Sequence, residues 1–320
     1  MMKNLNYCCL VLLLLSSTMK GQQLPYYTQF RSNDFLQNPA VSGTKRTIDA
    51  RLNYRMQWLG FEGAPRTESF SLNSRFYKGR MGAGVYMMQD KVGPAKQMNL
   101  GASYAIHFRF PDCELSAGVG GNYTNYTLLG SLITLHHTQD PSIDQNVSSS
   151  VWVGDANAGI YLYNDRFHLG ASAMHLLQST AAFYKSDSIK RGKVKYATQA
   201  NVSVGYNFGQ NPSYIWESNL FANYVTGLPI MLDYTLRLHV KEKFMTGISL
   251  RLHDAVAIHF GISFLENFQA SYSYDLLISN LRPYSSGSHE IMLVYNMKYH
   301  SGKHGFLDTQ FLHQKYGYML

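Results

Sequence analysis

Apolar and polar residues alternate one by one along several stretches of this chain. In residues 48–58, Ile, Ala, Leu, Tyr, Met and Trp occupy the even positions, and Asp, Arg, Asn, Arg and Gln the odd ones. The same period of two recurs in residues 97–109, 230–240, 255–264 and 291–299. Because successive side chains of a β-strand point to opposite faces, this period predicts strands with one apolar and one polar face.

The predicted strands are long. Strands of soluble proteins usually have about five or six residues, whereas a tilted strand that crosses a bilayer needs about 9–11. The lengths and the even number of segments predict an all-β fold, a transmembrane outer-membrane β-barrel of about 14 antiparallel strands. We expect the strands at residues 46–58, 67–77, 80–88, 97–109, 114–126, 151–163, 166–175, 196–208, 214–224, 230–240, 243–252, 255–264, 267–276 and 289–299.

The connections between the predicted strands alternate in length. Every second connection is short, as at residues 78–79, 111–112 and 241–242, whereas the others include the long stretches 127–150 and 176–195. Short turns on one side and long loops on the other are typical of outer-membrane barrels. The alternation predicts a protein of the cell outer membrane with periplasmic termini and long extracellular loops.

The first 21 residues have the pattern of a secretory signal peptide. Lys3 supplies a positive charge, residues 9–15 form an apolar run, and small residues up to Gly21 offer a cleavage site. Seven apolar residues are too few to span a bilayer as a helix. Cys113 is the single cysteine after this segment, so we expect no internal disulfide.

The rest of the chain divides into three parts. Residues 22–44 carry four aromatic side chains and are too long for a simple chain end, which suggests either a plug in the lumen or a periplasmic docking segment. Residues 45–300 hold the predicted barrel. Residues 301–320 form a tail, either a periplasmic partner contact or a disordered end.

Composition excludes several other classes of protein. The chain has 15% charged residues, 14% aromatic residues and a mean hydropathy of −0.20. Disordered chains have few aromatics and high charge, and the chain has no later run of 18 apolar residues that would predict a helical membrane protein. The formal net charge is +8, but the basic residues form no block that would track phosphates, so we expect no nucleic-acid partner.

No motif in the sequence predicts catalysis or metal binding. The twelve histidines are scattered, and the sequence contains no HExxH, GxSxG, Walker A or EF-hand pattern. We therefore expect no catalytic residue, no metal and no cofactor, and not an enzyme. Gly118, Gly120 and Gly121 lie within a predicted strand, where glycines more often relieve bending or crowding than bind phosphate.

Five segments carry a resemblance to a known family. They are FLQNPAVSG (35–43), QWLGFEGAPRT (57–67), QDKVGP (89–94), MHLLQS (174–179) and SYDLLISNLRPYSSGSHEIMLVY (273–295). In this order and spacing they resemble the PorP/SprF family of type IX secretion system membrane proteins. The resemblance covers nearly the whole chain after the signal segment.

The resemblance implies a role in protein secretion. Such a barrel belongs to the type IX protein secretion system and supports export or surface attachment of a partner protein, such as a gliding-type adhesin. The implied partners are a periplasmic ring and peptidoglycan-linked proteins, or a secreted adhesin, together with the lipid bilayer. The alternative is a general outer-membrane porin or transport channel, and a soluble exported sandwich is a third possibility.

Two of the resembling segments supply the candidate site. Trp58, Leu59 and Phe61 are too apolar for a loop free in water, so the loop either folds into the barrel mouth as a plug or docks an exported partner. A second loop with Asp90 and Lys91 can pack beside it. The candidate plug or partner-binding residues are Trp58, Leu59, Phe61, Pro65, Arg66, Asp90 and Lys91.

Overall fold

The computed structural model of the chain describes most of the predicted barrel. The described residues are 25–45, 47–76, 79–132, 148–183, 193–209, 211, 213–265 and 267–298. The predicted signal peptide (1–21) and tail (301–320) lie outside the described residues. No helix among the described residues is long and apolar enough to cross a membrane.

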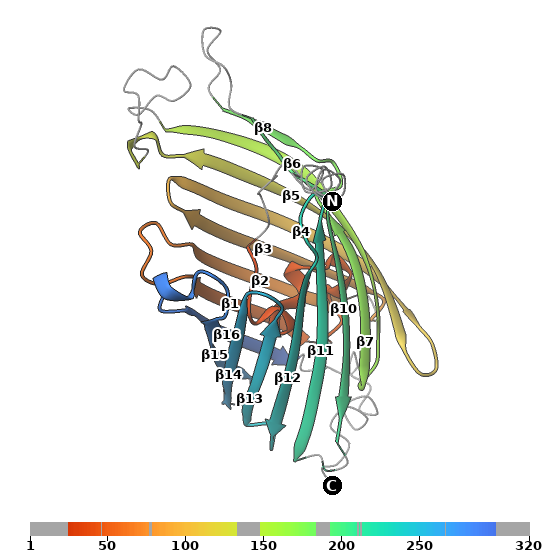
Figure 1. Cartoon of the computed structure of the whole chain (residues 1–320). Helices are drawn as coiled ribbons and strands as arrows, with labels where there is room; N and C mark the ends of the chain where they lie inside the picture. The colour runs from red at the N-terminus through yellow and green to blue at the C-terminus, as the bar shows by residue number, and fades with distance from the viewer. Residues whose placement is uncertain are drawn as a thin grey trace, which may run out of the picture.

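Fourteen antiparallel strands close into a barrel, which confirms the predicted fold (Figure 1). Strands that follow one another in the chain are also neighbours in the barrel, except that β7 pairs with β10, and β1 closes on β16. The predicted strand boundaries agree with the structure to within about four residues. The barrel strands are β1 (Thr47–Met56), β2 (Arg66–Phe76), β3 (Met81–Val92), β4 (Ala95–Arg109), β5 (Glu114–Leu128), β6 (Ser149–Tyr163), β7 (Phe167–Met174), β10 (Gln199–Phe208), β11 (Tyr214–Val225), β12 (Met231–Val240), β13 (Phe244–Arg251), β14 (Ala255–Phe264), β15 (Phe268–Leu277) and β16 (Ser288–Lys298).

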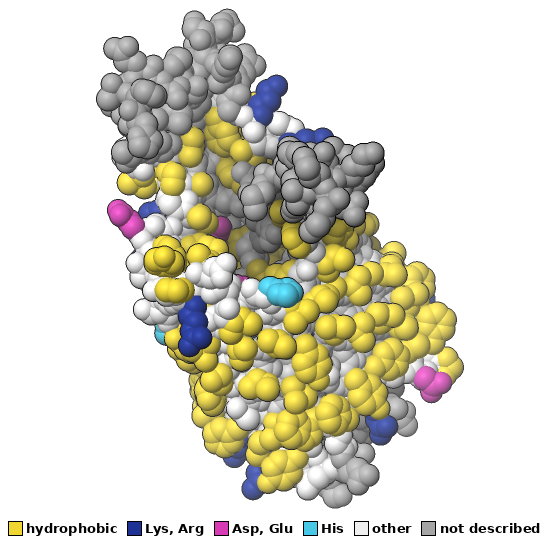
Figure 2. Space-filling view, in the orientation of Figure 1, with side chains coloured by type: hydrophobic (Ala, Val, Ile, Leu, Met, Phe, Trp, Pro, Cys, Tyr) yellow, Lys and Arg dark blue, Asp and Glu magenta, His cyan; other side chains and the backbone are white. Residues whose placement is uncertain are grey.

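The alternating residues sort onto the two faces of the barrel wall. In β1, Leu52 is 53% exposed on the outside, whereas its neighbours Arg51 and Asn53 are buried inside. Hydrophobic side chains cover the outer side of the barrel, and charged side chains gather toward its ends (Figure 2). The outer face is therefore suited to lipid, and the polar set lines the lumen.

The barrel has two different ends. We call the end with connections 110–113, 164–166, 241–243 and 265–267 the short-turn end. The opposite end is the long-loop end, and its connections include 57–65, 129–148, 175–198 and 278–287.

The wall is taller on one side of the long-loop end. Strands β4, β5 and β6 have 15 residues each, whereas β7 and β13 have eight. At roughly 3.3 Å per residue, a seven-residue difference extends a strand by about 23 Å. At the long-loop end, these long strands therefore project beyond their neighbours. We call this projecting part of the wall the tall rim.

A short hairpin inside the predicted loop 176–195 is not expected from the sequence. Its strands, β8 (Thr180–Ala182) and β9 (Lys193–Lys195), pair with each other and prolong the β7–β10 pair beyond a bend. His175 and Gln178 have positive φ angles of 57° and 49° at this bend. Three-residue strands are too short for a period of two to be recognised in the sequence.

The hairpin leans over the inner face of the tall rim. Ala181 and Phe183 from the hairpin segment pack with Val153 of β6 and with Tyr196 in a buried cluster, which Tyr126 extends. The ring of Phe183 lies edge-on to that of Tyr126, with centroids 6.1 Å apart. Apolar contacts therefore hold the hairpin against the inner face of the tall rim.

Candidate functional site: an amino-terminal strap inside the barrel

Residues 25–44, which we call the strap, lie inside the barrel (Figure 1, red). The strap contains two 3-10 helices, η1 (Phe30–Leu36) and η2 (Pro39–Val41). Pro39 opens η2, and the side chain of Asn38 accepts a hydrogen bond from the Ala40 amide, which caps this short helix. The buried hydrophobic side chains that join strap and wall in one cluster are Tyr27, Phe35, Leu36, Ala40, Val41, Met88 and Tyr161.

The strap runs through the lumen from one end to the other. Near its start, the Tyr26 hydroxyl donates a hydrogen bond to Asp233, close to the long-loop end of β12. Near its end, the Gly43 amide donates to Asn73, close to the short-turn end of β2. The chain then enters β1 from the short-turn end.

Glycines in the wall make room for the strap. A Cβ atom on Gly82 would lie 2.0 Å from the Ser42 carbonyl oxygen, and one on Gly118 would lie 2.5 Å from Ala40. A Cβ on Gly159 would lie 2.2 Å from the Asn38 side chain. Real Cβ atoms are essentially never this close to another atom, so a larger residue at these positions would require the strap or its side chains to shift.

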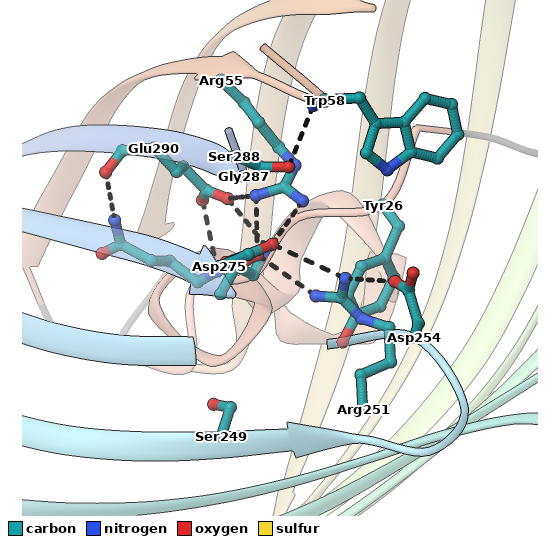
Figure 3. A network of polar contacts seen from close by, with 12 residues as sticks. Tyr26, Arg55, Trp58, Ser249, Arg251, Asp254, Asp275, Gly287, Ser288 and Glu290 are labelled. Carbon is teal, nitrogen blue, oxygen red and sulfur yellow. Dashed lines mark hydrogen bonds and ion pairs between the residues drawn. The ribbon is translucent and has the colours of Figure 1, made fainter. Parts of the chain in front are cut away.

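An ionic cluster holds the start of the strap to the wall (Figure 3). The Arg55 guanidinium on β1 pairs with Asp275 of β15 at 2.8 Å and with Glu290 of β16 at 3.0 Å. The same guanidinium donates a hydrogen bond to the Thr28 hydroxyl at 2.6 Å. All three charged side chains are at most 1% exposed. We call the four wall residues Arg55, Arg251, Asp275 and Glu290 the clamp.

Strap backbone and side chains complete the clamp. Glu290 accepts hydrogen bonds from the Thr28 and Gln29 amides, and the Thr28 hydroxyl donates to Asp275. The Arg251 guanidinium donates to the same hydroxyl at 3.1 Å and lies 4.2 Å from the centre of the Tyr26 ring. The wall carboxylates thus have partners that the strap supplies.

Tyr26, at the partly exposed start of the strap, has a phenol whose ordinary pKa is about 10. The phenol therefore stays neutral and keeps its donor proton at any physiological pH. Its hydrogen bond of 2.8 Å to Asp233 is a stable contact at the mouth of the lumen.

The clamp has a defined energetic role. Buried ion pairs contribute little net stability compared with apolar packing, but removal of one partner leaves an uncompensated charge and costs about 3–5 kcal/mol. The clamp therefore fixes where the strap lies more than it adds to the free energy of unfolding.

Further polar contacts seat the strap deeper in the barrel. Arg31 pairs with Asp34 of the strap and with Glu217 of β11, at 2.6 and 2.9 Å. The Asn38 amide donates to the carbonyl oxygens of Ile160 and Ala171, on β6 and β7. These contacts join the strap to the side of the wall that the clamp does not reach.

Little space remains between the strap and the wall in this part of the lumen. Two cavities there measure about 10 Å³ each, which is room for about one water molecule. Pro25, Tyr27 and Leu36 border the first, and Phe30, Arg31 and Asn38 border the second.

The loop of the first candidate residues packs at the long-loop end. The Leu59 amide donates to the Gly287 carbonyl at 2.9 Å, and the Ser286 amide donates to the Leu59 carbonyl at 2.7 Å. The Trp58 amide donates to the Ser288 hydroxyl, while its indole points away from the clamp (Figure 3). This loop and the connection 278–287 therefore form one contiguous surface.

A groove of about 570 Å³ lies in this surface. Leu59, Phe61, Pro65, Arg66 and Lys91 line it, so the structure brings five of the seven candidate residues together. The remaining two lie outside its lining. Trp58 is half-buried beside Ser288, and the Asp90 carboxylate accepts a hydrogen bond from the Thr67 hydroxyl at 2.7 Å.

No sequence motif identifies the clamp residues. Arg55, Asp275 and Glu290 are charged residues at lumen-facing positions of predicted strands, and this was the available signal. Arg55 and Glu290 face each other across the β1–β16 pair. They are 235 positions apart in the chain, so only closure of the barrel reveals their contact.

Comparison with known protein families finds one match over most of the chain. The sequence profile of the type IX secretion system membrane protein PorP/SprF matches residues 19–295. No curated protein matches the sequence.

Several solved structures are similar over most of the chain. A Pseudomonas aeruginosa FadL homologue is 12% identical, with a TM-score of 0.47, over 88% of this chain and 96% of that protein. The Pseudomonas putida toluene transporter TodX is 11% identical, with a TM-score of 0.45, over 89% and 97%. The Acinetobacter baumannii outer membrane protein Omp33 is 10% identical, with a TM-score of 0.43, over 79% and 99%.

Proposed function

The chain belongs to the type IX secretion system membrane protein PorP/SprF family, and on that premise we propose that this outer-membrane barrel supports export or surface attachment of a partner protein. The observation that carries the proposal is the strap, which occupies the lumen that a diffusion pore needs open. A general porin or transport channel is the competing function.

We place the long-loop end outside the cell and the short-turn end in the periplasm. Outer-membrane barrels have short periplasmic turns and longer extracellular loops. In this orientation the short-turn end is the surface that meets a periplasmic ring and peptidoglycan-linked proteins of the secretion system.

The groove at the long-loop end is the proposed docking site for the exported partner, for example a gliding-type adhesin. Phe61 is 37% exposed and Tyr284 is 70% exposed, and their ring centroids are 6.5 Å apart. Arg66 and Lys91 add positive charge to the groove, which also contains Glu62. An aromatic surface with charged neighbours suits an exposed peptide segment of a surface protein.

A display experiment in cells tests this role. Deletion of the gene removes a specific protein from the cell surface, and the wild-type chain restores it. The variant Phe61→Ser restores less display than the matched variant Leu132→Ser, because Leu132 is 55% exposed at the same end but does not line the groove. Equal restoration by both variants contradicts the assignment of the groove.

Conductance separates the two candidate functions. The purified full chain in planar bilayers gives no large unit conductance if the strap fills the lumen. A large, stable conductance of the wild-type protein favours the porin and overturns the secretion proposal.

A further inference from the structure

The direction of the strap decides on which side of the membrane the chain starts. Its first contacts with the wall are all near the long-loop end. Tyr26 meets Asp233, two residues after the start of β12, and Thr28 meets Asp275 and Glu290, which lie two residues from the long-loop ends of β15 and β16.

The last strap residues contact the opposite end. The Ser42 carbonyl lies 3.0 Å from His107 Nε2, two residues before β4 ends at the short-turn end. Gly43 packs against the backbone of Ser74 and Arg75, at the short-turn end of β2. The strap therefore crosses the lumen once and does not return.

Burial along the strap agrees with a single crossing. Residues 27–30 and 35–43 are buried, whereas Pro25 and Tyr26 at one end and residues 44–45 at the other are partly exposed. Residues 31, 32 and 34 within the strap are also partly exposed, so the contacts at its two ends, and not exposure alone, define its course. Among the described residues, the first thus lies toward the long-loop end and the last, at 298, lies at the short-turn end. The prediction of two periplasmic termini assumes that the chain does not cross the lumen before β1.

We infer that the mature amino terminus emerges through the barrel and is displayed at the long-loop end, on the cell surface. The inference rests on the orientation given under the proposed function and on removal of residues 1–21. Pro25, the first described residue, then lies toward the mouth on the same side as the groove. An exported partner at the groove would meet this displayed terminus as well as the loops.

The same topology limits what can precede the strap. The space between strap and wall holds about one water molecule at the two cavities near its course, so no folded domain passes the lumen. A short peptide ahead of the strap can thread through as the barrel assembles. A stably folded domain fused ahead of Gln22 cannot, because it would have to reach the outer face.

Single-cysteine labelling tests the inference. In a Cys113→Ser background, Gln23→Cys reports the amino terminus, Glu62→Cys reports the long-loop end, and Asp112→Cys reports the short-turn end. Intact cells are treated with a membrane-impermeant maleimide, before and after permeabilisation of the outer membrane. We expect residues 23 and 62 to react on intact cells and residue 112 only after permeabilisation.

The outcomes separate the inference from the proposed orientation. If residue 62 reacts on intact cells and residue 23 does not, the threaded terminus is wrong while the orientation stands. If residue 112 reacts and residues 23 and 62 do not, the barrel is inverted, but the terminus still follows the long-loop end. A barrel that assembles normally with a folded domain fused ahead of Gln22 and held in the periplasm also overturns the inference.

Discussion

The β5–β6 pair contains two regions in which the same alternation has opposite polarity. In the region nearer the short-turn end, Val119 and Ile160 point outward and Asn157 points inward. The outside is therefore apolar and the lumen polar. In the tall rim, Asn125 and Ser150 face outward and bond to each other at 2.8 Å. The inner face there is apolar, with Tyr126, Leu128, Val151 and Val153 packed against the β8–β9 hairpin.

The change of polarity marks the level at which the wall leaves the bilayer. Tyr123 and Trp152 stack outside with centroids 5.0 Å apart, directly below the polar pair of Asn125 and Ser150. Aromatic side chains of this kind mark the membrane interface of barrels. Above it we expect water outside, because the rim carries its apolar side chains on the inner face and a polar pair on the outer face. The position of water, and not the strand itself, decides which face of a strand is apolar.

The largest expected effect is on ion conductance through the part of the lumen that the strap fills. Gly118→Leu places a side chain where the Ala40 backbone lies, so the strap must leave this part of the wall. We expect unit conductance in planar bilayers that the wild-type protein lacks. Gly121→Leu is the matched control, because a Cβ at Gly121 meets no atom within 4 Å. If Gly118→Leu also lacks conductance, the proposed contact of the strap with this part of the wall is wrong.

The clamp gives the next effect. Arg55→Met leaves the buried Glu290 without its guanidinium partner and Asp275 with only the longer pair to Arg251 at 3.6 Å, and we expect a loss of about 3–5 kcal/mol in the free energy of unfolding. Urea unfolding in lipid vesicles, followed by the shift of the folded barrel on gels, measures this loss. The exposed Arg66→Met serves as the control and should change the midpoint little. An unchanged unfolding midpoint in Arg55→Met would contradict the role of the clamp in holding the strap to the wall.

A pair of lysine variants tests the boundary between the two regions directly. Val119→Lys puts a charge on the lipid face, at an expected cost of about 2–4 kcal/mol, whereas Thr127→Lys on the same outer face of the rim costs about 0–1 kcal/mol. The same vesicle unfolding assay measures both. Equal costs mean that the rim lies in lipid as the lower barrel does.

The smallest effect concerns the packing of the hairpin at acid pH. Burial lowers the pKa of His175, which Asp155 at 3.3 Å partly opposes. A lowered pKa means that the packed, neutral form stabilises the fold above the ordinary value of about 6.5, and that this contribution is lost as pH falls toward the lowered pKa. We expect faster proteolysis of the hairpin at pH 5 than at pH 7.5.

His175→Phe is the control for this experiment. A phenyl ring keeps the stacking on Tyr196, where the two rings are 4.3 Å apart and nearly parallel, but has no proton to gain. The pH dependence of proteolysis should disappear in this variant. If it persists unchanged, another group is responsible.

The alternation predicted the wall because its signal is local. Whether Leu52 faces outward and Arg51 inward follows from neighbouring positions alone, and so do the strand lengths. The sequence leaves the strap between two alternatives, since nothing local distinguishes an aromatic segment that enters the lumen from one that docks elsewhere. Gly82, Gly118 and Gly159 all fall on lumen-facing positions of their strands, where they leave room for the strap. This pattern is a sequence signal that the strap enters the lumen.

The remaining features depend on distant parts of the chain. The contact of Arg55 with Glu290 requires the first and last strands to meet. The polarity change in the rim depends on a contact distant in the chain, because Tyr126 and Val151 pack on the inner face against Phe183. The β8–β9 hairpin is too short to leave a periodic trace.

The clamp joins the two strands that close the cylinder. Arg55 belongs to β1 and Glu290 to β16, and the Thr28 amide and hydroxyl contact Glu290 and Arg55 directly. Without the strap, the β1–β16 seam would bring together buried charges whose hydrogen-bonding partners are incomplete. We therefore expect an emptied cylinder to be least stable at the junction between its own beginning and end.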